Sequence, residues 1–78
     1  MIKILCFAYL RDKIGEPSIQ IEKDNMTIGE IKNYMAEKYN IPTCLNMLSS
    51  INEEYADNDA IATSGDVVAL IPPLGGGI

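Results

Sequence analysis

The stretch that decides the fold is residues 65–73, which read Gly-Asp-Val-Val-Ala-Leu-Ile-Pro-Pro. Positions 67–71 are apolar without interruption, which is typical of a strand that is buried on both faces. Proline has no backbone N–H to donate to a neighbouring strand, so Pro72 and Pro73 are expected to end it. The polar residues 64–66 predict a tight turn immediately before the strand.

A second apolar strand is predicted at the N-terminus, over residues 1–9. Residues 11–15 form a polar break, and residues 18–22 alternate apolar with polar side chains, as a half-buried strand does. If the connection is a hairpin, this strand runs antiparallel to the first. The first and last strands are the most apolar, so we expect them to be neighbours in the middle of a sheet.

One main helix is expected to begin after Thr27. Thr27 and Glu30 have the spacing of a capping box, and Asn40 and Pro42 are expected to end the helix. Helical spacing predicts an apolar face made of four side chains: Ile28, Ile31, Met35 and Tyr39. The opposite, solvent-facing side is expected to contain Lys32, Asn33 and Glu37.

The remaining segments complete a two-layer α+β domain. Residues 48–52 predict a short strand, 23–26 a turn, and 58–64 a loop or short helical turn. The expected architecture is therefore a mixed sheet of about four to five strands, with one main helix packed on one face. Since one helix covers only one face, apolar side chains remain on the other. This indicates a partner surface, unless loops fold over it.

Composition and charge exclude several classes of function. The 78 residues are enough for one domain, 47 % of them are hydrophobic, and the net charge is −5. Nucleic acid is an unfavourable partner for an acidic chain, and no apolar run approaches the roughly 20 residues of a membrane span. We also expect no secretory signal.

Catalytic and metal chemistry are poorly supported. The chain has no histidine, so neither a Ser-His-Asp triad nor a Cys-His dyad can form from it. Cys6 and Cys44 make no metal-binding pair, and we expect reduced thiols in a cytoplasmic protein. A crowded acidic segment favours a solvated turn over a cation site; its members are Glu53, Glu54, Asp57 and Asp59. We expect no metal site and no independent enzymatic activity.

Four sequence segments together resemble the small, sulfur-carrying subunit of molybdopterin synthase, the MoaD group of the ubiquitin-like β-grasp proteins. They are 7–12 with Gly15, 27–31, 51–55 and 65–77. The last is the most specific, because it combines Gly-Asp, a hydrophobic strand, Pro-Pro and a run of glycines. The resemblance extends nearly from end to end and implies a β-grasp domain over 1–74, followed by a flexible glycine tail over 75–78.

The resemblance implies a carrier rather than an enzyme. A MoeB-like adenylating enzyme would use ATP to activate the carboxylate of Gly77, which follows Gly76, and a sulfur donor would convert it to a thiocarboxylate. No cofactor is expected on the chain itself. A MoaE-like large subunit would then use the sulfur on a cyclic pterin precursor. The implied partner-binding residues are Phe7, Tyr55, Ile71, Pro72, Pro73, Leu74 and Gly75. Arg11 also matches a family position near the first loop; the alternatives are a solvated loop residue and a surface ion pair.

Ile78 departs from the family pattern, because the family ends at the glycine that corresponds to Gly77. Three explanations stand: a C-terminal peptidase removes Ile78, the residue is an addition, or the chain carries no sulfur. Besides the molybdopterin carrier, three other functions are considered. They are a related carrier for thiamine, cysteine or tRNA thiolation, a ubiquitin-like modifier, and a pure interaction module. The Pro-Pro pair favours the molybdopterin carrier.

Overall fold

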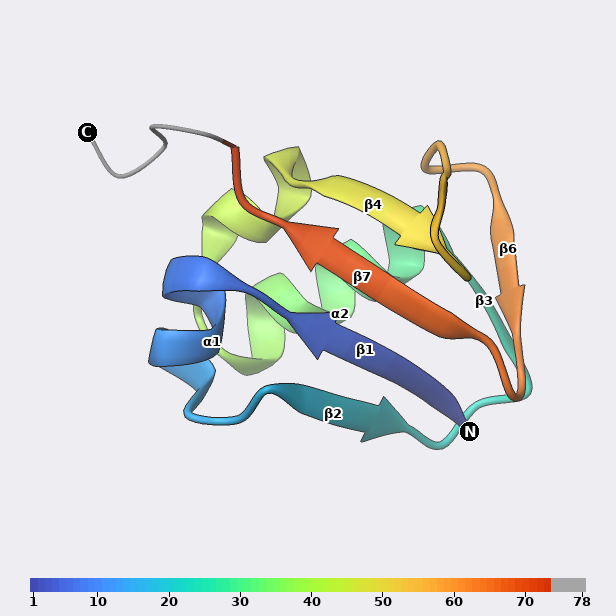
Figure 1. The fold of residues 1–78 in the computed structure, drawn as a ribbon, viewed down its shortest axis with the longest axis horizontal. Helices are drawn as coiled ribbons and strands as arrows, with labels where there is room; N and C mark the ends of the chain where they lie inside the picture. Colours follow the sequence, from blue (N-terminus) through green and yellow to red (C-terminus); the bar gives the residue numbers. More distant parts are fainter. Residues whose placement is uncertain (74–78) are drawn as a thin grey trace.

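The computed structural model describes residues 1–73, in which five strands form one mixed sheet (Figure 1). The strands are β1 (Ile2–Cys6), β2 (Ser18–Ile21), β4 (Leu48–Ile51), β5 (Glu54–Tyr55) and β7 (Val67–Ile71), in the order β2-β1-β7-β4-β5. β1 and β7 are parallel neighbours, and the other pairs are antiparallel. The prediction that the first and last strands lie together inside the sheet is confirmed.

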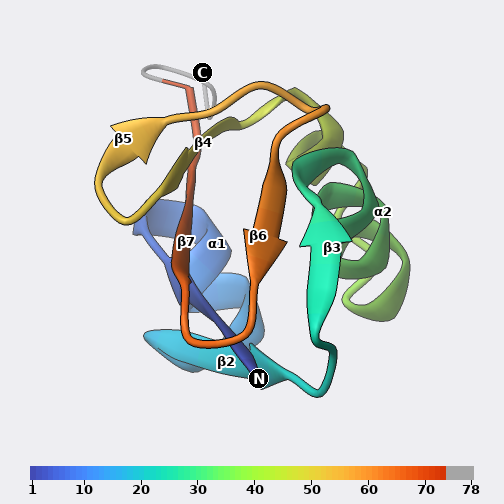
Figure 2. The ribbon, with the colours of Figure 1, turned by 90° about the vertical axis from the view of Figure 1, so that its right-hand side faces the viewer.

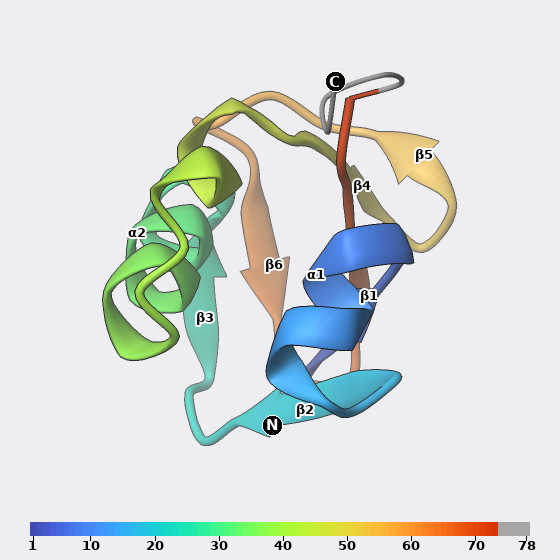
Figure 3. The ribbon, with the colours of Figure 1, turned by 90° about the vertical axis from the view of Figure 1, so that its left-hand side faces the viewer.

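The helix α2 (Ile28–Lys38) covers one face of this sheet. Figures 2 and 3 show the sheet edge-on, with α2 to one side of it. Its capping box is present: the Glu30 amide donates to Thr27 Oγ1 at 3.1 Å, and the Thr27 amide donates to Glu30 Oε1 at 2.8 Å. Alternate side chains of the strands point toward the helix and form the core with it. Members of this core include Ile2, Ile4, Cys6, Val68 and Leu70 from the sheet and Ile28, Ile31 and Met35 from α2.

A second helix, α1 (Ala8–Ile14), was not expected from the sequence. The predicted strand over 1–9 is therefore too long, and the predicted polar break over 11–15 is wrong. The helix buries Leu10 completely against the core, which stabilises a segment whose start is not marked by any capping side chain. It ends at Gly15, whose φ of 85° suits glycine and whose N–H donates to the Arg11 carbonyl at 2.8 Å.

Two further strands make a separate small sheet. β3 (Asn25–Thr27) pairs antiparallel with β6 (Ile61–Thr63), where a turn and a loop were predicted. Met26 and Ala62 are directly opposite and both are buried. Because the two strands are more than thirty positions apart in the sequence, no local pattern predicts that they pair. A 3₁₀ helix, η1 (Pro42–Asn46), connects α2 to β4.

Lys32 corrects the predicted solvent face of α2. Only 7 % of it is exposed, and its Nζ donates to Asn58 Oδ1 at 2.8 Å. The segment before β6 passes over the start of the helix, where the amides of Ile28 and Gly29 donate to the carbonyls of Ala60 and Asn58. This tertiary contact covers a side chain that helical periodicity alone assigns to solvent.

The expected boundary between a domain over 1–74 and a tail over 75–78 lies outside the described residues, since the last of them is Pro73. No helix within residues 1–73 is long and apolar enough to span a membrane.

Candidate functional site: the open face of the sheet

The parallel pairing of β1 and β7 places Phe7 beside Ile71. The last paired residues are Cys6 and Leu70, and Phe7 continues in extended conformation with φ −124° before α1 begins. The carboxyl ends of both strands therefore lie at one edge of the sheet, where β7 leads into Pro72 and Pro73 (Figure 1). Phe7 is 43 % exposed and Ile71 is half-buried.

The antiparallel strands bring two more large side chains to the same face. Leu48 lies opposite Ile71, and Tyr55 lies opposite Ser50, which in turn pairs with Ala69. Because residues directly opposite each other point to the same side of a sheet, Tyr55 and Leu48 both point away from α2. Their exposed fractions are 79 % and 54 %. Figure 2 shows β5 on the side of the sheet away from α2.

These residues define what we call the open face. Its apolar members are Leu5, Phe7, Leu48, Tyr55, Val67, Ala69 and Ile71. A hollow of about 320 Å³ is lined by Phe7, Tyr55 and Ile71 together with Leu5, Ala69, Ser50 and Glu53. Three implied partner-binding residues that are distant in sequence thus surround one hollow. No described loop covers it, so the structure retains the apolar second face that the sequence analysis anticipated.

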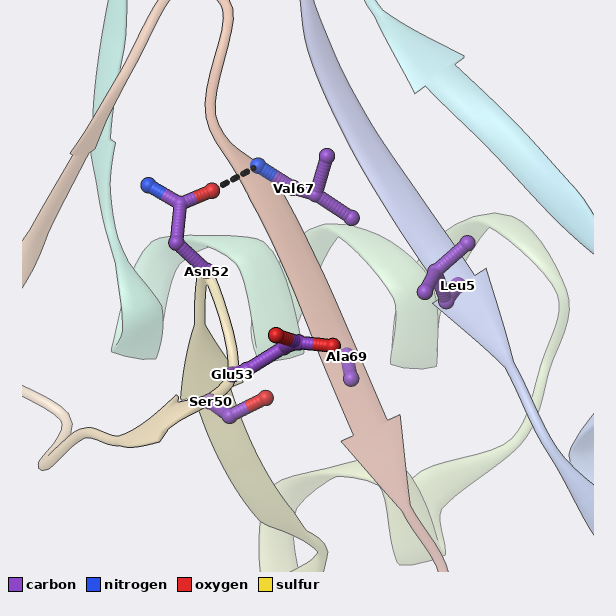
Figure 4. Close-up of a pocket in the computed structure, with 6 residues that line it drawn as sticks. All are labelled: Leu5, Ser50, Asn52, Glu53, Val67 and Ala69. Carbon is purple, nitrogen blue, oxygen red and sulfur yellow. Dashed lines mark hydrogen bonds between the residues drawn. The ribbon is translucent and has the colours of Figure 1, made fainter.

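A second hollow, of about 310 Å³, adjoins the first along β7 (Figure 4). Its floor is formed by Leu5, Val67 and Ala69, and its rim by the turn between β4 and β5. Leu5 and Ala69 belong to both hollows. The open face is therefore one continuous apolar surface with two depressions rather than a single deep pocket.

A hydrogen-bonded clamp fixes the turn at this rim. The Val67 amide donates to Asn52 Oδ1 at 3.0 Å, and Asn52 Nδ2 donates to Asp66 Oδ1 at 3.0 Å. The other carboxylate oxygen of Asp66 accepts from the amide and hydroxyl of Thr63, at 2.8 and 3.1 Å. These donors, first the Thr63 amide and then Asn52, hold the pKa of Asp66 below its usual value. Asn52 and Asp66 belong to two of the sequence segments that resemble the MoaD group. Their hydrogen bonds give both side chains a structural role, which is to hold the turn at the edge of the open face.

Neither cysteine is placed for chemistry. Cys6 and Cys44 are free and buried in the core. Burial raises the pKa of both thiols, and the proximity of Cys44 raises that of Cys6 further. A thiol with a raised pKa is a weak nucleophile at neutral pH. Cys6 instead packs in the core as a small apolar side chain, with 2 % of it exposed.

The remaining predicted site residues are distributed as follows. Pro72 is half-buried and Pro73 is exposed, directly after β7. Leu74, Gly75, Gly76 and Gly77 lie outside the described residues, so their predicted roles rest on sequence. Arg11 is an exposed residue of α1. The carboxylates of the crowded acidic segment, at positions 53, 54, 57 and 59, are all exposed.

Leu48 and Glu53 also belong to this surface, although the sequence did not predict either of them there. Leu48 begins the strand expected at 48–52, but its position opposite Ile71 depends on a register between distant segments. Glu53 was grouped with its acidic neighbours. The signal that distinguishes it is the two-residue hairpin Asn52-Glu53, which turns its side chain back over the sheet (Figure 4).

Comparison with known proteins agrees with this geometry. Two curated relatives, from Escherichia coli (strain K12) and Haemophilus influenzae, are each named "Molybdopterin synthase sulfur carrier subunit". Each is 30 % identical over 81 residues, covering 99 % of this chain and 100 % of the relative.

Solved structures share the fold. The small archaeal modifier protein 1 of Haloferax volcanii superposes with a TM-score of 0.76 at 20 % identity, covering 92 % of this chain and 95 % of that one. Similar too is a complex of subunits 1 and 2 of the molybdopterin-converting factor from Helicobacter pylori, with a TM-score of 0.66, 23 % identity and 92 % coverage of each chain. The β-grasp, ubiquitin-like fold expected from the sequence is thereby confirmed. A model described as the ThiS family matches residues 4–77, and the chain belongs to that family.

Proposed function

We propose that this chain is a sulfur carrier that supplies the sulfur of molybdopterin as the small subunit of a molybdopterin synthase. One observation carries the proposal: the apolar open face borders the point where β7 leads into the proline and glycine segment. A partner that docks on Phe7, Tyr55 and Ile71 would hold the start of that segment next to its own surface. The names of the curated relatives support this role.

The reactive group is the carboxylate of Gly77 once Gly77 is the last residue. A carboxylate is a poor electrophile, so an adenylating enzyme first joins it to the α-phosphate of ATP and releases pyrophosphate. A hydrosulfide equivalent then attacks the acyl carbon, AMP leaves, and a thiocarboxylate remains after loss of a proton. The chain has no histidine and its thiols are buried, and in this scheme the catalytic groups for both steps come from partners.

Glycine at positions 75–77 fits this chemistry because a backbone without side chains can enter a narrow active site. Pro72 and Pro73 restrict the backbone just before it. In the proposed complex, Leu74 and Gly75 would contact the partner near the entrance, and Gly76 would precede the reactive residue inside. The chain binds no cofactor of its own in this scheme, and the activating enzyme consumes the ATP.

The proposed partner for sulfur transfer is a large synthase subunit. The Helicobacter pylori structure is a complex of subunits 1 and 2 of a molybdopterin-converting factor, which is the type of assembly proposed here. The net charge of −5 suits docking to a basic partner. We place the reaction in the cytoplasm, where the two buried thiols stay reduced.

Ile78 must be removed before the chain can act, because Gly77 otherwise has a peptide carbonyl instead of a carboxylate. We propose that a peptidase trims it. The test uses two versions of the chain, one ending at Gly77 and one at Ile78. Each is incubated with a MoeB-like adenylating enzyme, ATP and sodium sulfide, with an established carrier as positive control.

Intact mass spectrometry then reports whether one oxygen has been replaced by sulfur. The proposal predicts this exchange only for the chain that ends at Gly77. Exchange at Ile78 would contradict the trimming step. Absence of exchange in both chains, while the established carrier reacts in the same mixture, would contradict the carrier function itself.

A further inference from the structure

Glu53 occupies a backbone position that favours glycine. It is the second residue of the two-residue hairpin between β4 and β5, and the φ values of Asn52 and Glu53 are 51° and 73°. Hairpins of this kind need positive φ at both positions, and glycine is preferred at the second. Asn52 offsets its conformational cost with the hydrogen bonds to Asp66 and Val67. Figure 4 shows no comparable hydrogen bond between Glu53 and any other residue drawn in it.

The left-handed turn directs the Glu53 side chain over the open face. In Figure 4 it extends from the hairpin across β7 toward Ala69. Glu53 lines both hollows, and it is the only acidic residue that lines either of the two. The floor beneath it is apolar, formed by Leu5, Val67 and Ala69. A carboxylate from the rim thus reaches over both hollows of the surface that the proposed function assigns to partner docking.

A partner that buries this face must also stabilise the Glu53 carboxylate. If it covered Glu53 with apolar groups alone, it would remove water from a carboxylate without replacing the hydrogen bonds, which is strongly unfavourable. A guanidinium or ammonium group from the partner would supply those bonds. Lys3 lies on the same face, paired with Val67, but it does not line the hollow.

We propose that Glu53 is a specificity-determining residue, which receives one arginine or lysine side chain from an otherwise apolar docking segment of the partner. The stem of that side chain lies on Leu5, Val67 and Ala69, and its cationic end meets the carboxylate. The inference rests on the proposed function in one respect, namely that the open face is the docking face. It adds the chemistry by which the correct partner is distinguished from other apolar surfaces.

Glu54 provides a matched control on the same hairpin. It has the same charge and is also exposed, but it lies opposite Ile51, whereas its neighbour Tyr55 lies opposite Ser50 on the open face. Glu54 therefore points to the other side of the sheet, and it lines neither hollow of the open face. Glu53→Gln and Glu54→Gln remove the same charge from adjacent positions, so any difference between them reports the position of Glu53.

The first experiment uses small probes with the free chain, so no partner is needed. Benzamidinium combines an apolar ring with a planar cation, and benzamide is its neutral counterpart. Each is titrated into ¹⁵N-labelled protein, and the amide shifts of Leu5, Val67 and Ala69 are followed. Benzamidinium is expected to bind about fivefold more tightly than benzamide to the wild type and to Glu54→Gln. In Glu53→Gln the two probes should bind equally.

A second variant separates recognition from folding. Glu53→Gly removes the carboxylate and places glycine where positive φ favours it, so its melting temperature should rise while the preference for benzamidinium disappears. Equal binding of the two probes to the wild type, or a preference for benzamidinium that survives in Glu53→Gln, would overturn the proposal. A fall in the melting temperature of Glu53→Gly would contradict the idea that Glu53 is held there at a conformational cost.

A partner-level measurement completes the test. With the large subunit of the Helicobacter pylori molybdopterin-converting factor as the probe, Glu53→Gln should weaken binding about tenfold and reduce its salt dependence, while Glu54→Gln should change little. Equal effects of the two substitutions would refute the assignment. The thiocarboxylation assay of the wild-type chain ending at Gly77 is independent of this result. If that chain gains sulfur while the two substitutions affect binding equally, only the recognition inference has failed.

Discussion

Replacing Tyr55 with alanine is the sharpest test of the open face as a docking surface. Tyr55 is 79 % exposed in the free chain, so its loss should change the free energy of unfolding by only about 0.5 kcal/mol or less. An aromatic side chain buries roughly 200 Å² when it is covered, which leaves about 160 Å² for a partner to bury. At about 25 cal/mol per Å² this area corresponds to a ceiling of about 4 kcal/mol.

The expected loss of binding free energy is smaller than that ceiling, because the hydroxyl stays hydrated and alanine retains the β-carbon. We expect about 2 kcal/mol, which is about a thirtyfold rise in Kd. The assay is isothermal titration calorimetry with a molybdopterin synthase large subunit that binds the wild-type chain. Urea unfolding of the same samples checks that stability is retained.

Ile61→Ala is the matched control for Tyr55→Ala. Ile61 is 61 % exposed, but it belongs to β6 in the small second sheet and not to the open face. Its replacement should leave Kd within about twofold, as expected for a residue outside the interface. If Tyr55→Ala and Ile61→Ala had equal effects on Kd, the reasoning that places the docking surface on the open face would be refuted.

Three further predictions concern the scaffold. Thr27→Ala removes the acceptor for the Glu30 amide and should lower the free energy of unfolding by about 1 kcal/mol, measured by urea denaturation. The pKa of Asp66 is lowered in the folded state, so its contribution to stability is present above the unfolded pKa and is lost as pH falls. The stability difference between wild type and Asp66→Asn should therefore shrink below about pH 4 in denaturation at several pH values, and a constant difference would contradict the role of the carboxylate. Cys6 and Cys44 should react with Ellman's reagent only in denaturant, and rapid labelling of the native chain would show that the core is open.

The parts of the fold that sequence predicts well are those with a local signal. The capping box at Thr27 and Glu30 is set by a spacing of three residues, and the structure contains both of its hydrogen bonds. The strand over 67–71 is apolar at every position and is central in the sheet. In both cases the local preference and the tertiary environment favour the same structure.

The parts that sequence does not predict depend on contacts between distant segments. Residues 8–14 follow directly on an apolar strand, with no capping side chain to mark a helix start, and they form α1 with Leu10 buried in the core. β3 and β6 contain three residues each, and their pairing places Met26 against Ala62. Lys32 is covered by a segment more than twenty positions away. Periodicity within a window contains none of this information.

The candidate site shows the same division. Phe7, Tyr55 and Ile71 came from a family resemblance, and the structure brings them around one hollow. Leu48 and Glu53 become visible only when the register of β4 with β7 and the left-handed hairpin are known. The apolar second face itself was predictable, because one helix is too few to cover both sides of a sheet whose two central strands have apolar side chains on both faces.

The most direct test of the central claim is the intact mass of the chain ending at Gly77 after incubation with an adenylating enzyme, ATP and sulfide. The account predicts that one oxygen is replaced by sulfur, that the exchange requires ATP, and that the chain ending at Ile78 remains unchanged. An unchanged mass for the chain ending at Gly77, beside a reacting control carrier, would contradict the claim that this protein carries sulfur.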